Sequence, residues 1–317
     1  MARLPNKAFQ QTVALLKDKD AKKEIYPGTK QRKIVWPAYT PTQIQALKET
    51  LVFIRDSVDA CSMRSTKSKV GRPLTNPKSL AKAVLFCEFI GTSEREAEGW
   101  LELIGPFLGI YEDLDDWVIG RAYERPEVAY ILQQVFMNNK ESDGLLSGDG
   151  TGLERSRKQN YASNKKQGTY MTSIVDSREI VQTFDISGVQ ECQIMHELVK
   201  QVTGGSIRLD AGFNDRALVE LIDKLGMACY VYPKISNNLN GKIAWKSMYL
   251  NFFFDIYSWL KEYHQRSHCE SFHSAFKRVY GIMTKVKYAS RLSQVSARII
   301  LHNRRRLAYF SRIEKSS

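Results

Sequence analysis

The stretch YHQRSHCESFHSAFK, residues 263–277, combines acidic, basic and aromatic residues at helical spacing. In a helix, Arg266, Glu270 and Lys277 follow one another at spacings that stack side chains on one face, and Tyr263 lies on that face one turn earlier. Two cations then flank one carboxylate, and nearby positive charge keeps a carboxylate ionised. Such a Glu suits a metal ion on one side and phosphates on the other. The alternative is an ordinary ion-pair ladder on a helix surface.

The composition indicates a globular protein with a polyanionic partner. The chain has 317 residues, a formal net charge of +13 and a hydrophobic content of 43%. That length suits two domains, and that apolar content is enough for real cores. The positive excess attracts phosphates, so nucleic acid is the expected partner and an anionic membrane is the second candidate. If the partner is DNA, binding should weaken with salt.

The cysteine pattern and the apolar segments indicate in which cellular compartment the protein is expected. Five cysteines are scattered along the chain without a CxxC pair, which argues against a disulfide framework and against a zinc site. A reducing, intracellular setting fits that usage. The first residues lead into no apolar segment, so we expect no signal peptide. The most apolar run, 248–260, contains Asn251 and Asp255 and is too short to span a bilayer.

Residues 1–142 are expected to form an all-α N-terminal region that binds DNA. A first helix is expected over 6–17, followed by a loose charged connector that is either a solvated arm or a contact to the DNA backbone. A second helix is expected to begin at Thr40-Pro41 and to run to about residue 58. The basic loop after it, 64–73, suits phosphate contact.

Two adjacent helices within this region resemble a helix-turn-helix. Asn76 and Pro77 cap the first, and Gly91 ends it. Ser93 and Glu96 form a capping box for the second, which is expected to stop at 105–106. The tight junction between them is equally compatible with a DNA-reading unit and with a plain helical hairpin in a core. Two further helices are expected over 116–123 and 125–138.

Residues 143–317 are expected to form an α/β domain with a mixed sheet flanked by helices. An apolar run from Leu145 leads to Asp149 among glycines, and another from Ser206 leads to Asp210, so both acids are expected at strand ends. The other expected elements are an antiparallel hairpin (170–175 and 179–186), a helix (189–202), a helix capped by Asn214 and ended by Gly226, a strand (228–232), and the helix of residues 263–277.

Three acids can combine into one metal site. Asp149, Asp210 and Glu270 follow one another at intervals of about 60 residues. Carboxylates alone select a hard ion such as Mg²⁺ or Mn²⁺, and two such ions about 3.5–4 Å apart can hold the attacking and leaving oxygens of a phosphodiester displacement. Asp143 competes for the first position but precedes the strand, and Asp215 competes for the second but is expected inside the next helix.

Basic residues are concentrated in two further segments. One follows Asp149 and contains Arg155, Arg157, Lys158, Lys165 and Lys166. The other follows Glu270, where apolar residues at helical spacing predict a helix with a packed apolar face and an exposed basic face.

These residues resemble insertion-sequence transposases of the DDE type. The spacing Tyr263-x2-Arg266-x3-Glu270-x6-Lys277 is similar at every position to the Tyr-Arg-Glu-Lys signature of that group. The two Asp contexts upstream resemble it as well, and the likeness covers roughly residues 70–285. Many relatives carry a large β-rich insertion between the second Asp and the Glu, for which the interval here leaves no room.

The resemblance implies an RNase H-like catalytic fold, binding of terminal inverted repeats, hydrolysis at transposon ends, and transfer of the 3′-hydroxyl into target DNA. It implies that Asp149, Asp210 and Glu270 hold two Mg²⁺ or Mn²⁺ ions. It also implies double-stranded DNA as the partner, no membrane, a homodimer on DNA, and a cytoplasmic, nucleoid-associated location in a prokaryote. An inactive transposase-derived DNA-binding protein and a nuclease without strand transfer are the alternatives. The residues expected to contact DNA are Tyr263, Arg266, Lys277, Arg155, Arg157, Lys158, Lys165, Lys166 and Arg72.

Overall fold

The computed structural model describes residues 5–28, 32–63, 75–153, 169–187 and 190–316. The chain forms two compact units, each built from separate segments. A sheet unit comprises Met1–Lys33, Glu141–Gly152 and Thr169–Ala275, and a helical unit comprises Ile34–Lys140, Leu153–Gly168 and Phe276–Ser317. This grouping differs from a single division after residue 142, because the first helices pack with the sheet and the last helix packs with the helical unit. That the chain has two domains, 1–142 and 143–317, stays a prediction.

The helical unit contains the expected helices with some shifted ends. They are α3 (Trp36–Asp59), α4 (Pro77–Ile90), α5 (Glu94–Leu108), α6 (Asp116–Ala122), α7 (Pro126–Asn138) and α14 (Tyr288–Ser316). The predicted caps of α4 and α5 are confirmed, since Asn76 accepts from the Lys78 N–H and the Ser93–Glu96 capping box is formed. The predicted start of α3 and end of α5 are wrong, because Pro41 and Pro106 both lie inside their helices.

The basic residues of α14 are partly buried in ion pairs. Arg298 Nε lies 2.6 Å from Glu88 on α4, and both side chains are buried. Arg304 and Arg312 both pair with Glu49 on α3. The expectation that the basic face of this helix stays outside is therefore wrong for these three arginines, because distant helices supply the acids that neutralise them.

The sheet unit begins with two short helices, α1 (Asn6–Leu15) and α2 (Lys19–Ile25). The prediction of a loose connector after the first helix is wrong at α2, whose N-cap Asp18 accepts from the N–H groups of Asp20 and Ala21. Phe9 and Val13 of α1 are buried in the same core as the helices behind the sheet.

Five strands form one mixed sheet in the order β3-β2-β1-β4-β5. They are β1 (Leu145–Leu153), β2 (Thr169–Val175), β3 (Val181–Asp185), β4 (Ser206–Leu209) and β5 (Ala228–Val231). The predicted hairpin is confirmed by the antiparallel pairing of β2 with β3, and β4 lies parallel to both β1 and β5. The α/β prediction of a mixed sheet flanked by helices is thus confirmed, and the arrangement is compatible with an RNase H-like fold.

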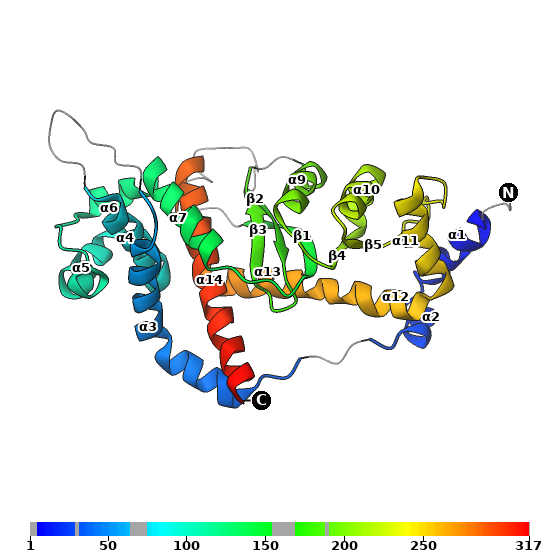
Figure 1. Cartoon of the computed structure of the whole chain (residues 1–317), viewed down its shortest axis with the longest axis horizontal. Coiled ribbons are helices and arrows are strands. Elements are labelled where there is room, and N and C mark those ends of the chain that lie inside the picture. The colour runs from blue at the N-terminus through cyan, green and yellow to red at the C-terminus, as the bar shows by residue number, and fades with distance from the viewer. Residues whose placement is uncertain (1–4, 29–31, 64–74, 154–168, 188–189, 317) are drawn as a thin grey trace. The chain divides into compact units, whose positions relative to one another are not determined.

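Helices cover both faces of this sheet. They are α9 (Glu191–Leu198), α10 (Arg216–Lys224), α11 (Ile243–Phe254), α12 (Ile256–Tyr263) and α13 (Ser267–Tyr280), with the 3₁₀ turns η1 (Val199–Gln201), η2 (Ala211–Phe213) and η3 (His264–Arg266). In Figure 1, α9 and α10 lie along one side of the strands, and α12 continues into α13 along the other side. The predicted N-cap Asn214 is wrong by one residue, since Asp215 caps α10.

A glycine allows α9 to approach β1 closely. A Cβ atom at Gly148 would lie 2.8 Å from Met195 Cε of α9 and 2.7 Å from Leu209 Cδ2 of β4. A larger residue at this position would push the helix or the neighbouring strand away, so glycine is required here by packing.

Candidate active site

The alternation of side chains along β1 and β4 aims two acids at the same face of the sheet. Ser147 Oγ donates to the carbonyl of Gln265 in η3 at 3.2 Å, and Arg208 Nε donates to the carbonyl of Glu262 in α12 at 3.1 Å. Every second residue of a strand faces the same side, so Asp149 and Asp210 follow these two toward η3 and α13.

The register of the parallel strands places these two acids at neighbouring positions, on β1 and just after β4. Gly148 of β1 pairs with Leu209 of β4 in the last matched position, and Asp149 and Asp210 are the next residues on each chain. Asp210 ends β4 as predicted, whereas the prediction that Asp149 ends its strand is wrong, because β1 continues to Leu153.

Arg266 connects the first acid to the third. Its Nη1 donates to Asp149 Oδ2 at 3.1 Å, and its Nη2 makes a short ion pair with Glu270 Oε1 one helical turn later. The Arg266 side chain is 18% exposed and that of Asp149 is 21% exposed, whereas Glu270 is more open. Arg266, in the turn η3, therefore links β1 of the sheet to α13.

The predicted single helix over residues 263–277 is wrong, because one 3₁₀ turn interrupts it. Tyr263 ends α12, residues 264–266 form the 3₁₀ turn η3, and α13 begins at Ser267. Tyr263 is buried and stacks on Trp259 one turn earlier, with ring centroids 5.2 Å apart and planes 11° apart. The turn at η3 directs Arg266 toward β1 while Tyr263 packs in the core.

The charges of the three acids act on one another. Burial raises the pKa of Asp149, and the negative charges of Asp210 and Glu270 raise it further, while the Gly150 N–H and Arg266 oppose the rise. The repulsion is the kind that a bound cation relieves. Carboxylate oxygens are also the donors that Mg²⁺ and Mn²⁺ prefer, so the donor set fits the ions that the sequence indicates.

The three carboxylates are not drawn into one tight cluster. Within the described ranges, a set of three potential ligand atoms all within 4.8 Å of one another is formed by Cys192, His196 and Asp215, and not by the three acids. Arg266 instead bridges two of the acids. A divalent ion bound to Asp149 and Glu270 would take over the positive charge that Arg266 supplies to them.

A cavity of about 350 Å³ opens beside this group. Asp210, Arg266 and Glu270 line it together with Lys17, in the turn between α1 and α2, and Lys22 of α2. Neither lysine belongs to a motif that the sequence shows, because only the folded chain brings residues so far upstream to the acids. Tyr263 and His264 also line the cavity.

Two of these residues, Lys22 and His264, carry partly buried basic groups. The ring of His264 stacks on Tyr26, with centroids 4.8 Å apart and planes 4° apart, and its buried Nε2 makes no hydrogen bond within the described residues. Burial lowers the pKa of Lys22, and burial together with the Lys22 charge lowers the pKa of His264. An anion bound here would stabilise both groups.

The remaining predicted DNA contacts are placed only in part. Lys277 is exposed on α13, in the part of that helix that belongs to the helical unit. Arg72, Arg155, Arg157, Lys158, Lys165 and Lys166 lie outside the described residues. Their role in binding DNA therefore stays a prediction.

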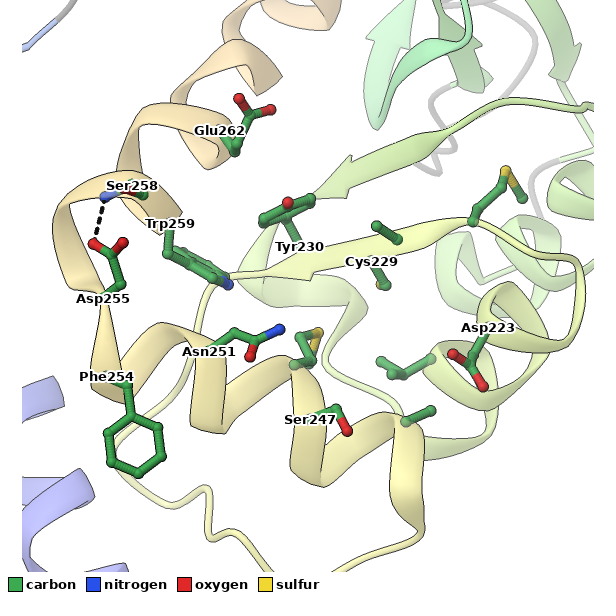
Figure 2. Close-up of a pocket in the computed structure, with 15 residues that line it drawn as sticks. Asp223, Cys229, Tyr230, Ser247, Asn251, Phe254, Asp255, Ser258, Trp259 and Glu262 are labelled. Atoms are coloured by element: carbon green, nitrogen blue, oxygen red, sulfur yellow. Dashed lines mark hydrogen bonds between the residues drawn. The ribbon is translucent and has the colours of Figure 1, made fainter.

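A second cavity, of about 510 Å³, lies elsewhere in the sheet unit. Residues of α10, β5, α11 and α12 line it, among them Asp223, Tyr230 and Trp259 (Figure 2). Glu262, at its rim, pairs with the buried Arg208. None of the three acids lines this cavity, so no part of the proposed chemistry is assigned to it.

Comparison with known proteins identifies a relative of stated activity. Over 285 residues the chain is 27% identical to a protein of Archaeoglobus fulgidus named "Probable transposase for insertion sequence element ISA1214", covering 85% of this chain and 84% of that protein. This similarity supports a transposase role. No protein-family model matches the chain, and no solved structure gives a significant match. In the described parts of the chain, every helix is too short or too polar to cross a membrane.

Proposed function

We propose that this protein is a DNA transposase of the DDE type, which cuts at the terminal inverted repeats of an insertion sequence and joins the 3′-hydroxyl ends to target DNA. The observation that carries the proposal is the group formed by Asp149, Asp210 and Glu270 around Arg266, beside a cavity with two lysines. The similarity to a protein named as an insertion-sequence transposase supports it.

The three acids hold Mg²⁺ or Mn²⁺ in this proposal. Two bound ions supply an activated water or 3′-hydroxyl and stabilise the leaving oxygen. Asp149 and Asp210 supply ligands from neighbouring strands, and Glu270 supplies its carboxylate from α13. Because β1 and β4 are fixed by the sheet, the first two ligands need little reorganisation, whereas the exposed Glu270 side chain can move to complete the site.

Arg266 has two partners in succession. Without metal, its guanidinium neutralises Asp149 and Glu270. With those acids bound to metal, the same fork of donors would be free to bind phosphate oxygens, a geometry that a guanidinium matches well. Lys17, Lys22 and His264 face the same cavity and bind the flanking phosphates. Tyr263 supports Arg266 from the core, since the two lie close enough for the Arg266 charge to lower the pKa of the buried phenol, which burial otherwise raises.

The partners follow from this chemistry. The substrate is double-stranded DNA, both as terminal inverted repeats and as target, and the net charge of +13 favours such a partner. Pairing of two ends before cutting requires two active sites, so we propose a homodimer on DNA. The protein then acts on the nucleoid in the cytoplasm of a prokaryotic cell.

A strand-transfer assay tests the proposal. Purified protein is incubated with Mg²⁺, a target plasmid and labelled DNA from the two flanks of the gene, where the proposal places the inverted repeats. We expect cleavage at the repeat ends and labelled DNA joined to the plasmid. Cleavage without joined product would instead assign a nuclease, and binding without cleavage would assign a transposase-derived DNA-binding protein.

A further inference from the structure

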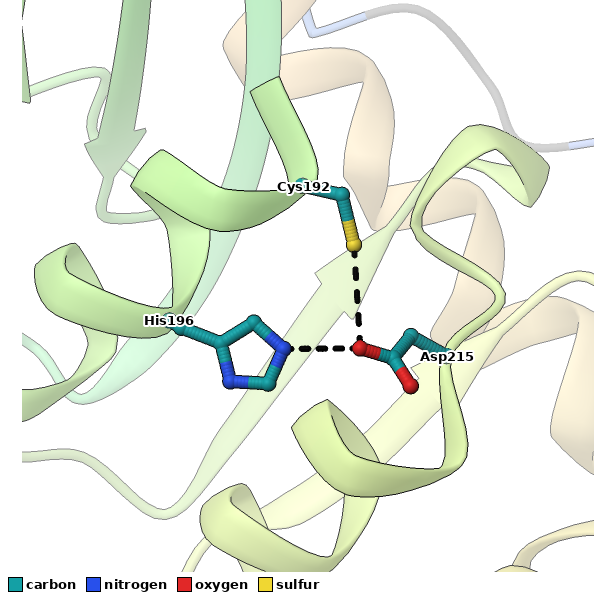
Figure 3. Close-up of side chains that lie close together, drawn as sticks. All are labelled: Cys192, His196 and Asp215. Carbon is teal, nitrogen blue, oxygen red and sulfur yellow. Dashed lines mark hydrogen bonds and ion pairs between the residues drawn. The ribbon is translucent and has the colours of Figure 1, made fainter. Parts of the chain in front are cut away.

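A second cluster of potential metal ligands lies between α9 and α10. Cys192 and His196 are one turn apart on α9, and Asp215 is the N-cap of α10. His196 Nε2 lies 2.7 Å from Asp215 Oδ2, and Cys192 Sγ lies 3.9 Å from the same oxygen. Figure 3 shows all three side chains converging on this point from the two helices.

The ligand types select a different ion from that of the three acids. A thiolate, an imidazole and a carboxylate form a mixed sulfur, nitrogen and oxygen set, which suits Zn²⁺ and not Mg²⁺. Three protein ligands leave a fourth tetrahedral position for water. His196 and Asp215 are 26% and 38% exposed, so an ion and that water can reach the cluster.

The distances are close to those of a zinc site. Tetrahedral Zn²⁺ with the usual bond lengths separates its nitrogen, oxygen and sulfur ligands by about 3.3–3.6 Å. The nitrogen–oxygen distance in the cluster, 2.7 Å, is shorter than this, and the sulfur–oxygen distance, 3.9 Å, is longer. All three ligand atoms lie within 4.8 Å of one another. Side-chain rotations that move the nitrogen and oxygen apart and bring the sulfur closer to the oxygen would approach the tetrahedral arrangement.

We propose that Cys192, His196 and Asp215 bind one Zn²⁺ ion that links α9 to the segment carrying Asp210. Asp215 keeps its second oxygen, Oδ1, on the Ala217 N–H, so capping of α10 and metal binding use different oxygens of one carboxylate. Cysteine pairs of the CxxC type are absent from the sequence, which is why no zinc site is expected from it. The partners of Cys192 are instead a histidine one turn away and an acid 23 residues later in the chain.

The position of this cluster gives the ion a structural role. Asp210 and Asp215 stand at the two ends of the short segment that contains η2. The residue before Cys192 on α9 is Glu191, whose carboxylate fills the space that a side chain at Gly150, next to Asp149, would occupy. An ion that ties α9 to Asp215 would therefore restrain the backbone on which both strand acids depend. The binding of the ion itself does not depend on the proposed transposase activity.

Binding of Co²⁺ and Zn²⁺ to the full chain tests this site without an activity assay. The chelator-treated protein is titrated with Co²⁺, and the thiolate-to-cobalt charge-transfer absorption is recorded before and after displacement by Zn²⁺. We expect the thiolate-to-cobalt band to saturate at one equivalent per chain, since of the two proposed metal sites only this cluster contains a cysteine, and Zn²⁺ to raise the melting temperature. Absence of the absorption band, or no change in melting temperature with Zn²⁺, would overturn the proposal.

Variants assign the ligands. Cys192→Ser should remove the charge-transfer band, and Cys229→Ser, which replaces the other half-buried cysteine, should keep it. Asp215→Asn keeps an N-cap oxygen for α10 and should weaken metal binding by at least about 10–100-fold, the range measured for lesser changes around metal ligands. If Cys192→Ser does not fold, the affinity of the Asp215→Asn variant for Co²⁺ decides whether the site exists. A band that persists in Cys192→Ser, or an unchanged affinity in Asp215→Asn, would contradict the site.

Discussion

Arg266 donates from Nη1 to Asp149 Oδ2 at 3.1 Å, although the two residues are 117 positions apart. This contact fixes the 3₁₀ turn before α13 against the middle strand of the sheet. The same guanidinium also pairs with Glu270. The Arg266 guanidinium thus supplies positive charge beside the acids. A bound metal ion would supply the same charge, and the first two predictions below concern this exchange.

Replacing Glu270 by Gln removes a carboxylate ligand and adds no bulk. We expect the Glu270→Gln variant to lose DNA cleavage while binding end-containing DNA with nearly unchanged affinity. Cleavage and gel-shift assays in Mg²⁺ measure both properties. Glu197→Gln, which removes an exposed carboxylate on α9 that pairs with Lys200, is the matched control and should cleave normally. Retained cleavage by Glu270→Gln would remove this residue from the metal site.

Removing the Arg266 guanidinium leaves the half-buried Asp149 close to two other negative charges. We expect Arg266→Ala to lower the free energy of unfolding by about 1–2 kcal/mol in the presence of a chelator. Since metal supplies the missing positive charge, saturating Mn²⁺ should recover most of that loss. Thermal or urea unfolding with and without Mn²⁺ measures the difference. A loss of the same size in both conditions would argue against a shared role of Arg266 and metal.

Lys22 is placed beside the acids by the packing of α2, and its partly buried ammonium is suited to a phosphate. We expect Lys22→Ala to weaken DNA binding and to reduce the slope of log affinity against log salt by about 0.9, the value for one phosphate contact on duplex DNA. Lys7→Ala removes the same charge from an exposed position on α1 that does not line the cavity. Equal effects of the two variants would show that only net charge matters.

Gly148 is required where α9 and β4 approach β1. The added methyl group of Gly148→Ala would lie 2.8 Å from Met195 and 2.7 Å from Leu209. We expect a destabilisation of about 1–3 kcal/mol, typical of overpacking. Urea unfolding measures it, and Gly205→Ala, whose added methyl group meets no atom within 4 Å, is the comparison. Unchanged stability of Gly148→Ala would mean that α9 can shift without cost.

The strands and several helix caps were predictable from sequence because their signals are local. Alternating β-branched residues gave the hairpin, and Asn76, Ser93 and Glu96 gave two helix starts. The break at η3 contains neither Pro nor Gly, and the contact of Arg266 with β1 that accompanies it is tertiary. A sequence pattern with helical spacing therefore suggested one continuous helix where the chain forms two.

Features that depend on distant partners were not predictable. The arginines of α14 looked like a free basic face, but Glu49 and Glu88 are supplied by α3 and α4. Lys22 and His264 carry no local motif, and the fold alone brings them to one cavity. By contrast, the two apolar runs that lead to Asp149 and Asp210 could be recognised as strands in advance, although the continuation of β1 past Asp149 could not.

Anomalous diffraction from crystals grown with Mn²⁺ tests the central claim most directly, because it locates the ion without an assay for a particular DNA. We predict a manganese peak bonded to the carboxylates of Asp149 and Asp210, with Arg266 no longer in contact with Asp149. A structure with saturating Mn²⁺, no peak at these acids and an intact Arg266–Asp149 ion pair would contradict the account.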